Sequence, residues 1–275
     1  MILENSQRFC RDLFDLESSS HSVSSRMNLR LRRKRGFHGD EGFGIYLFKF
    51  DKEILYAGSY CGSAGVSKDR WWTHLAGITC RFQETNFTNL SSKLEPTLNA
   101  LIACNDNEAI ERLLLKYKAR FEEVYSNVVS NKAFKADVYD KLMGLTSQSS
   151  KHELRHLLGD GRCSTFVNRV EVANANWDVF RELSISDIGN LFSFTYTRIS
   201  AAQSQSALAS FLYNNNSDAK LKKRLVQRYI EDRIIKVLAP PANKSKEPID
   251  GTEFDKDIRV EAAEIVHRIL DSEGL

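Results

Sequence analysis

The chain has 275 residues, of which 42% are hydrophobic and 27% are charged. This length can bury a sizeable core and the composition is that of a globular protein, so a disulfide-stapled peptide, collagen, a coiled coil and a fully disordered chain are excluded. Lys and Arg (39) barely outnumber Asp and Glu (36), so the net charge of +3 is only a weak indication of an acidic partner.

The N-terminus and the cysteines bear on the cellular compartment. Charges interrupt the apolar residues of the segment 1–20, whereas a signal peptide needs an apolar run of about seven residues or more. No later stretch has the apolar length of a membrane span. The five cysteines contain no CxxC pair, which argues against a disulfide framework and a zinc site. We therefore expect a cytoplasmic protein with reduced thiols and no membrane contact.

The N-terminal region is expected to hold a short helix and a basic arm. Phe9, Leu13 and Leu16 are spaced to share one helical face within residues 6–16. After a serine-rich loop, RMNLRLRRKR places six cations among the ten residues 26–35. This run suits either a solvated strand or loop, or an arm that contacts phosphates.

Two strand-like runs follow, GIYLFKF at 44–50 and ILYAGSY at 54–60, separated by the polar turn DKE. They are close enough in the chain to form an antiparallel hairpin. The loop CGSAGVSK then leads into DRWWTHL. This pattern predicts a helix that begins with Ser67 or Asp69 near its N-cap.

The remaining chain contains helical patterns and one further strand pattern. Apolar residues keep helical spacing between 105 and 128, which predicts a long amphipathic helix. Aromatic residues alternate with Ser and Thr in FSFTYTRIS at 192–200, which predicts a strand, and a helix is expected over 201–213. Two more helices are expected, one at 220–238 that ends before a double proline, and a last one in which Ile258, Ala262, Ile265 and Ile269 share a face.

Residues 44–75 carry the densest set of chemically useful side chains. Tyr46 and Tyr56 on neighbouring predicted strands are followed by Arg70 and His74, which are four residues apart on one predicted helical face. Arginine offers a forked donor to phosphate oxygens, tyrosine can bind or deprotonate a water if its pKa is lowered, and histidine can accept or relay the proton. This set suits phosphodiester hydrolysis, which usually also requires a metal ion.

GIY at 44–46, YAG at 56–58 and RWWTH at 70–74 resemble the motifs of the GIY-YIG nuclease family, with Ala57 in place of the family's Ile or Val. The resemblance covers residues 42–80 and 190–216. It implies an α+β fold with a small three-stranded antiparallel sheet flanked by helices. It also implies roles for four residues: Tyr46 as general base or water-orienting tyrosine, Tyr56 as its partner, Arg70 as phosphate clamp and His74 as a nearby hydrogen-bonding base.

Three regions are expected on this basis. An N-terminal helix and basic arm occupy 1–40, the nuclease core occupies 41–216 with a large, mostly helical insertion at about 81–189, and a C-terminal helical extension occupies 217–275. Loop insertions often carry recognition residues, because a rigid core positions them over the substrate. The three tryptophans are candidates for stacking against bases, with core burial as the alternative: Trp71, Trp72 and Trp177.

The resemblance further implies a glutamate on the helix after the third strand, as the ligand of one Mg²⁺ ion with Mn²⁺ as an alternative, and an asparagine beyond it, matched by Asn215. Gln205, or less favourably Gln203, stands at the glutamate position, and a neutral amide should bind a divalent cation much more weakly. Three explanations stay open. They are an engineered Glu-to-Gln replacement that traps a substrate complex, a ligand from elsewhere such as Glu153 with His152 and His156, and a natural pseudo-nuclease.

The first functional hypothesis is a metal-dependent DNA endonuclease that hydrolyses phosphodiester bonds, most similar to the type II restriction members of the family. Double-stranded DNA would be held by Arg32, Arg33, Arg35, Asn215, Lys222, Lys223 and Arg224. A homodimer would allow both strands to be cut, and the last helix offers an apolar stripe for it. The alternatives are a noncatalytic DNA-binding protein on the same fold, and an accidental match in which both tyrosines are ordinary strand aromatics.

Overall fold

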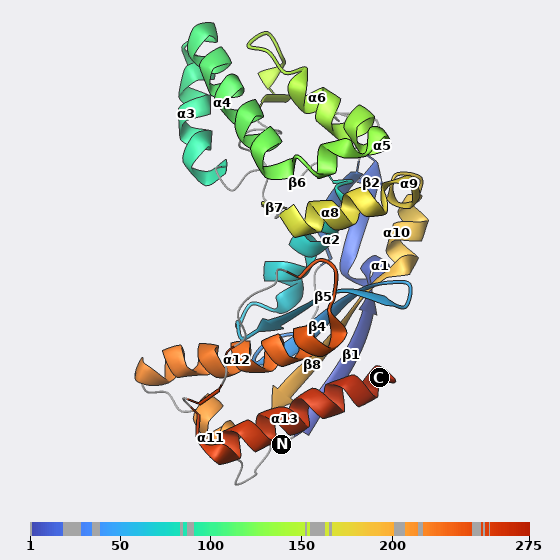
Figure 1. Ribbon diagram of the computed structural model, residues 1–275, viewed down its shortest axis with the longest axis vertical. Helices are drawn as coiled ribbons and strands as arrows, with labels where there is room; N and C mark the ends of the chain where they lie inside the picture. Colours follow the sequence, from blue (N-terminus) through green and yellow to red (C-terminus); the bar gives the residue numbers. More distant parts are fainter. Residues whose placement is uncertain are drawn as a thin grey trace. The chain divides into compact units, whose positions relative to one another are not determined.

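The computed structural model describes residues 2–18, 29–34, 39–82, 85–86, 91–151, 153–154, 163–164, 167–200, 207–213, 217–243, 249, 251–252 and 254–275. The chain is α+β, as expected (Figure 1). It divides into two compact units, each of which is described by itself. The first unit contains Met1–Cys10, Arg35–Asp69 and Leu191–Leu275, and the second contains Arg11–Lys34 and Arg70–Asn190. In the described residues, no helix is both long enough and apolar enough to cross a bilayer.

The first unit is built on an antiparallel sheet of four strands, one more than expected. The order across the sheet is β1 (Ile2–Phe9), β8 (Phe192–Ser200), β4 (Gly44–Phe50) and β5 (Glu53–Tyr60). β4 and β5 form the predicted hairpin, whose tight turn is possible because Asp51 adopts a positive φ of 53°. The predicted strand at 192–200 is confirmed, and its residues 192–198 pair with all seven residues of β4.

The helix predicted over 6–16 is wrong. The chain forms strand β1, then a single helical turn, α1 (Cys10–Leu13), then strand β2 (Phe14–Ser18). All eight residues of β1 pair with β8 in unbroken register, from Ile2 with Ser200 to Phe9 with Ser193. This pairing satisfies the strand's backbone groups along one side, and such tertiary context outweighs a short helical spacing of apolar side chains.

Three helices cover one face of this sheet: α11 (Ala207–Tyr213), α12 (Ser217–Leu238) and α13 (Lys256–Ser272) (Figure 1). Ile45 and Leu47 of β4 point into the core that these helices form with the sheet. The apolar stripe of α13 is part of this core, with Ile258, Ala262, Ile265 and Ile269 at most 4% exposed. The stripe is therefore not available as a dimer surface, and that part of the sequence prediction is wrong.

The loop after α12 closes the β5 edge of the sheet. The backbone N–H of Ala242 donates to the Leu55 carbonyl at 2.9 Å. The side chain of Asn243 then takes the place of a strand residue: the Ala57 N–H donates to Asn243 Oδ1 at 2.8 Å, and Asn243 Nδ2 donates to the Ala57 carbonyl at 2.7 Å. Both backbone groups of Ala57 are thus satisfied by a single amide.

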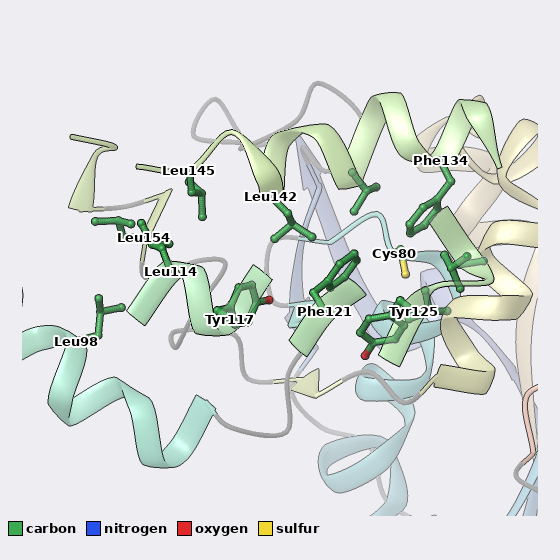
Figure 2. Close-up of a cluster of buried hydrophobic side chains, with 14 of the residues drawn as sticks. Cys80, Leu98, Leu114, Tyr117, Phe121, Tyr125, Phe134, Leu142, Leu145 and Leu154 are labelled. Carbon is green, nitrogen blue, oxygen red and sulfur yellow. The ribbon is translucent and has the colours of Figure 1, made fainter. Parts of the chain in front are cut away.

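The second unit is mainly helical. Its longer helices are α2 (Trp72–Thr79), α3 (Ser91–Ala103), α4 (Asn107–Tyr125), α8 (Val167–Ala175) and α10 (Ile185–Leu191), with short turns α5 (Lys132–Phe134), α6 (Asp140–Met143) and α9 (Trp177–Phe180). α4 confirms the predicted amphipathic helix, and Asp106 caps it by accepting from the Ala109 N–H at 3.0 Å. Its apolar face supplies Leu114, Tyr117, Phe121 and Tyr125 to the core shown in Figure 2.

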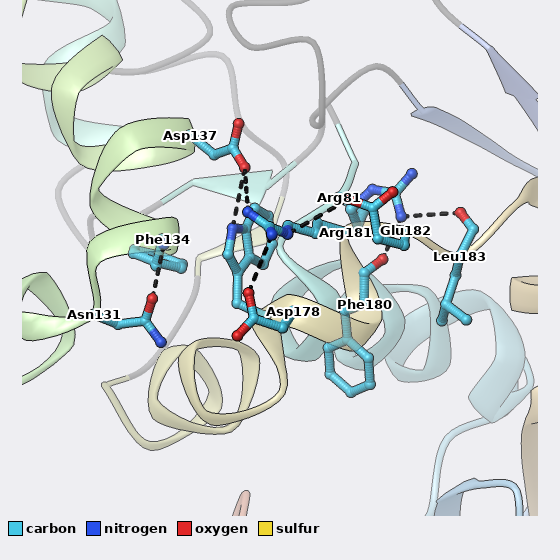
Figure 3. A network of polar contacts seen from close by, with 10 residues as sticks. Arg81, Asn131, Phe134, Asp137, Asp178, Phe180, Arg181, Glu182 and Leu183 are labelled. Atoms are coloured by element: carbon cyan, nitrogen blue, oxygen red, sulfur yellow. Dashed lines mark hydrogen bonds and ion pairs between the residues drawn. The ribbon is translucent and has the colours of Figure 1, made fainter.

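A polar network ties α9 to the π-helical turn Lys135–Tyr139 and to the end of α2 (Figure 3). Arg181 lies within 3.9 Å of carboxylates of both Asp137 and Asp178, and the indole Nε1 of Trp177 donates to Asp137 Oδ2 at 3.3 Å. Arg81 donates to the carbonyl oxygens of Phe180 and Leu183. Trp177 is fully buried, as is Trp71, so core burial is confirmed for these two tryptophans and base stacking is not supported.

The basic run after the serine-rich loop forms a strand, β3 (Leu29–Arg33), which pairs antiparallel with β2. The pairing places Arg32 opposite Asp15 and Arg30 opposite Glu17. Leu29 is buried, and its N–H donates to the Arg81 carbonyl at 3.4 Å. The run is therefore one side of a two-stranded ribbon anchored to the helical part of its unit.

Candidate active site

Tyr46 and Tyr56 lie on the same face of the first unit's sheet. Tyr46, on the central strand β4, pairs with Gly58 on β5, and Tyr56 pairs with Phe48. Because these positions are two residues apart along each strand, both side chains leave the same face. The phenol rings are stacked, with centroids 6.1 Å apart and an interplanar angle of 22°. Tyr46 is only 3% exposed and Tyr56 is half-buried, so Tyr56 is the more accessible of the two.

Glycine at 58 allows Tyr46 to take this position. A Cβ on Gly58 would stand 2.5 Å from both Cζ and the hydroxyl of Tyr46, and 2.9 Å from Cε1 of Tyr56. Cβ atoms essentially never approach other atoms so closely. The glycine of YAG is thus required because the Tyr46 ring crosses β5 directly above it.

A third tyrosine of the same face, Tyr196 on β8, lies directly opposite Tyr46. Its ring covers Gly44, where a Cβ would stand 2.5 Å from Tyr196 Cζ, and its hydroxyl donates to the Gly42 carbonyl at 3.1 Å. Burial, and next the nearby Asp40 carboxylate, raise the pKa of Tyr196. The first glycine of the GIY motif therefore has a packing role, and Tyr196 is a structural phenol that stays protonated.

Arg70 and His74 belong to the second unit. Arg70 is exposed within a π-helical turn, Ser67–Trp71, and His74 is 2% exposed on the α2 helix that follows. Burial of the imidazole, followed by the nearby guanidinium groups of Arg169 and Arg70, holds the pKa of His74 well below its ordinary value of 6.5. His74 is therefore neutral near pH 7. A neutral imidazole can form hydrogen bonds, but at this pH it does not hold a proton that it could donate as a general acid.

Arg169 is the residue that sequence reasoning missed. It lies on α8, which packs against α2, and it is 8% exposed. Among the charged groups that act on His74, Arg169 has the larger effect and Arg70 the smaller. Two guanidinium groups thus lie near one neutral imidazole, and such a pair of cations attracts an anion with oxygen acceptors. No motif marks Arg169, because its contact with α2 arises from helix packing between segments about 95 residues apart.

The structure brings the predicted residues together in two pairs: Tyr46 with Tyr56 in the first unit, and Arg70 with His74 in the second. Each pair is held by the local fold of its own unit. Arg169 joins the second pair.

The described residues do not contain a metal site. None of their His, Cys, Asp and Glu side chains form a group of three or more that could hold an ion. Near the tyrosine face, Asp69 accepts from the Tyr60 hydroxyl at 2.6 Å and Asp40 accepts from the Ser67 N–H at 2.8 Å, so both carboxylates anchor the loop after β5. The described part of the chain therefore does not fit the expected Mg²⁺ ligand set.

The positions that the resemblance assigns to metal binding lie outside the described residues: Gln205, the alternative Gln203, and Asn215. The other candidate ligand, Glu153, accepts from the Ser150 N–H at 2.8 Å while its own N–H donates to Ser150 Oγ at 3.2 Å. This reciprocal pair is a capping box, which gives Glu153 a structural role. Its proposed companions, His152 and His156, also lie outside the described residues.

The predicted DNA-contacting cations of the N-terminal arm lie on the β2–β3 ribbon of the second unit. Arg32 Nη2 lies 3.7 Å from Glu17 Oε2, and Lys34 Nζ lies 3.6 Å from Asp15 Oδ1. These exposed pairs offset part of the positive charge. Arg33 is exposed, and Arg35 lies outside the described residues.

The other predicted contacts lie on α12 in the first unit. Arg224 is exposed and Lys223 is half-buried, whereas the side chain of Lys222 lies outside the described residues. Further along the helix Arg228 Nε lies 3.8 Å from Asp232 Oδ2. The Asp232 carboxylate therefore offsets part of the positive charge of this helix.

A cavity of about 450 Å³ lies in the second unit between the β2–β3 ribbon and α10. Its polar lining mixes cations with acids, among them Arg11, Lys34, Asp15 and Glu17. The side chains already bond to one another or to the backbone, as when Lys34 Nζ donates to the Arg11 carbonyl at 2.7 Å. None of the predicted site residues lines this cavity, and its mixed charge favours no particular ligand.

Comparisons of the chain with protein-family models, with curated proteins and with solved structures found no match.

Proposed function

We propose that this protein is a phosphodiester hydrolase of the GIY-YIG type that acts on double-stranded DNA. The observation that carries the proposal is the stacked pair of Tyr46 and Tyr56, with Gly58 beneath Tyr46, on the hairpin β4–β5. The predicted third strand, β8, pairs with β4 in the same sheet. The sequence motifs and this arrangement of the two tyrosines support the same chemistry.

In the proposed reaction the Tyr46 hydroxyl orients a water molecule for attack on phosphorus. A bond forms between the water oxygen and phosphorus while the bond from phosphorus to the leaving sugar oxygen breaks. The water releases one proton to solvent, and the leaving oxygen takes one up from solvent. The resemblance assigns to Arg70 the non-bridging phosphate oxygens, where negative charge accumulates in the transition state. Neutral His74 contributes a hydrogen bond, because its lowered pKa disfavours the charged form. No step is assigned to a metal ion, since the described residues provide no site for one.

A noncatalytic DNA-binding protein is the second candidate, and two observations favour it. Glutamine stands where the family has its glutamate ligand, and the described residues gather no group of acidic or histidine ligands elsewhere. In this alternative Tyr46 and Tyr56 are packing residues, and the exposed cations Arg33 and Arg224 contact the DNA backbone.

Cleavage of a mixture of plasmids with Mg²⁺ or Mn²⁺ tests the proposal. We would compare the parent chain, Gln205→Glu, and Gln205→Glu combined with Tyr46→Phe, and measure DNA binding by each. The expected result is cleavage by Gln205→Glu that falls about 100-fold or more when the Tyr46 hydroxyl is removed. Discrete fragments would support a restriction-type enzyme. Binding without cleavage by all three proteins would favour the noncatalytic candidate, and absence of both would overturn the proposal.

A further inference from the structure

The two edge strands of the four-stranded sheet differ in which parts of the chain bond to their outer side. The β5 edge is closed by Ala242 and Asn243, which bond to Leu55 and Ala57. The opposite edge is β1, and in the part of the chain that the structure describes, β8 is the only strand that pairs with it. β1 is eight residues long and contains no proline, and its pairing with β8 has no bulge. Natural proteins rarely leave an edge strand of this length and regularity without a cover.

Symmetry limits how a second copy of the chain could cover this edge. Two identical strands related by a two-fold axis pair antiparallel, so each residue i faces a residue j with a constant sum of the two numbers. Residues that lie opposite each other in an antiparallel pair have their side chains on the same sheet face, and their backbone N–H and C=O groups both point toward or both away from the partner strand. The two-fold axis must therefore lie midway between the two copies of one residue. The possible centres near the middle of β1 are Asn5, Ser6 and Gln7.

The register centred on Ser6 matches side-chain chemistry across the whole strand. It sets Glu4 opposite Arg8 twice, once on each side of the axis. It also sets Leu3 opposite Phe9, and Asn5 opposite Gln7. A centre at Asn5 would instead face Arg8 with Ile2, and a centre at Gln7 would leave Glu4 beyond the paired region. Opposite charges directly across an antiparallel pair are favourable, and apolar residues are then paired with apolar ones.

The exposure of these side chains agrees with such a role. Glu4 and Arg8 are both exposed, and they leave the sheet on one face because they are four residues apart on the strand. Within its own chain Glu4 lies 4.0 Å from Arg198, and the two side chains are 58% and 40% exposed. A contact at this distance and exposure is weak, so it competes little with a second partner across the edge.

We propose that β1 is a homodimer interface, in which two copies pair antiparallel about Ser6 and join their sheets into one of eight strands. The inference rests on the sheet alone and holds whether or not the protein cleaves DNA. The main-chain bonds of the new ladder would supply affinity, and the two Glu4–Arg8 pairs would select the register.

Sedimentation velocity on the full chain without DNA tests the proposal. We expect the parent protein to be a dimer, and Glu4→Arg and Arg8→Glu each to be monomeric, because each places two like charges across the edge. An equimolar mixture of these two variants should dimerise again, since one chain then carries two cations and the other two carboxylates. This recovery also shows that both variants are folded. A monomeric parent, or a dimer that both reversals leave intact, would overturn the proposal.

Disulfide trapping provides an independent check of the register. Residues at position 6 of the two copies would lie directly opposite, with Cα atoms about 4.5–5.5 Å apart, within disulfide range. Residues at position 4 would be displaced by four positions, about 13 Å, along the strand direction. Ser6→Cys should therefore form a covalent dimer on mild oxidation, and Glu4→Cys and the parent chain should not. Equal cross-linking of all three proteins would contradict the Ser6 register.

Discussion

Tyr46 crosses the backbone of Gly58, its partner in the β4–β5 register, so closely that a Cβ at residue 58 would stand 2.5 Å from the tyrosine hydroxyl. The same relationship recurs one strand away, between Tyr196 and Gly44. Packing against a tyrosine ring therefore requires glycine at both motif positions, whatever chemistry the site performs. Because the Tyr196 hydroxyl bonds to the Gly42 carbonyl, it is the Tyr46 hydroxyl to which we assign a function.

Substitution of Gly58 by alanine is expected to displace the Tyr46 ring, because the new methyl group has no room. Such overpacking should lower the free energy of unfolding by about 1–3 kcal/mol. Cleavage should be lost as well, since Tyr46 no longer points where the attacking water is oriented. Denaturant unfolding and DNA cleavage, the latter in whichever of the parent and Gln205→Glu backgrounds is active, measure the two effects.

Gly44→Ala is the matched control, because its methyl group would meet Tyr196 at the same 2.5 Å distance. Its stability loss should be similar, and its loss of cleavage smaller. If the two variants lose cleavage to the same extent, Tyr46 has no role beyond that of its packed neighbour.

The stability of the protein should depend on the buried His74. The pKa of His74 is well below 6.5 in the folded protein because of burial and the two arginines, whereas the unfolded chain takes up this proton near 6.5. Below that pH the unfolded state binds more protons, so stability falls as the pH falls, by up to about 1.4 kcal/mol per pH unit. Above it the contribution is constant.

His74→Gln should remove this dependence. Urea unfolding between about pH 7.5 and 5.5, the range in which an unperturbed histidine titrates, should show a smaller decline in stability for the variant than for the parent. His267→Gln, on the exposed side of α13, is the control and should leave the decline unchanged. Parallel pH profiles of the parent and His74→Gln would show that His74 is not buried in its neutral form.

The electrostatic effect of Arg169 should be measurable in the pKa of His74. Arg169→Gln removes the larger of the two cationic effects on the imidazole, so the pKa of His74 should rise, and Arg70→Gln should raise it less. NMR titration of the His74 ring protons measures both shifts. Cleavage should fall in both variants, and Arg169→Lys should retain part of it, because the ammonium keeps the charge without the forked geometry. An unchanged pKa of His74 in Arg169→Gln would show that Arg169 does not belong to the site of Arg70 and His74.

Asn243 should stabilise the β5 edge. Asn243→Ala leaves the Ala57 N–H and carbonyl without the amide that bonds both, at an expected cost of about 1–3 kcal/mol. Asn243→Asp keeps the acceptor for the Ala57 N–H and loses the donor to its carbonyl, so its cost should be intermediate. Denaturant unfolding gives the energies, and hydrogen exchange of the Ala57 amide reports the local effect. Wild-type protection of that amide in Asn243→Ala would refute the role.

Local patterns in the sequence determined the hairpin β4–β5, the amphipathic helix α4, the strand β8 and the end of α12 before its double proline. Each of these rests on the period of the side chains and on the conformational preferences of a few neighbouring residues. The same kind of reasoning placed Tyr46 and Tyr56 on adjacent strands, because a hairpin brings its two strands together without help from the rest of the chain.

Tertiary structure alone decided the features that depend on segments far apart in the sequence. β1 became a strand because it pairs with β8, with Ser6 and Tyr196 190 positions apart. The apolar stripe of α13 became core because the sheet and α12 cover it. Arg169 came next to His74 because α8 packs on α2. In each case the free energy comes from contacts with a distant partner, which a local period does not encode.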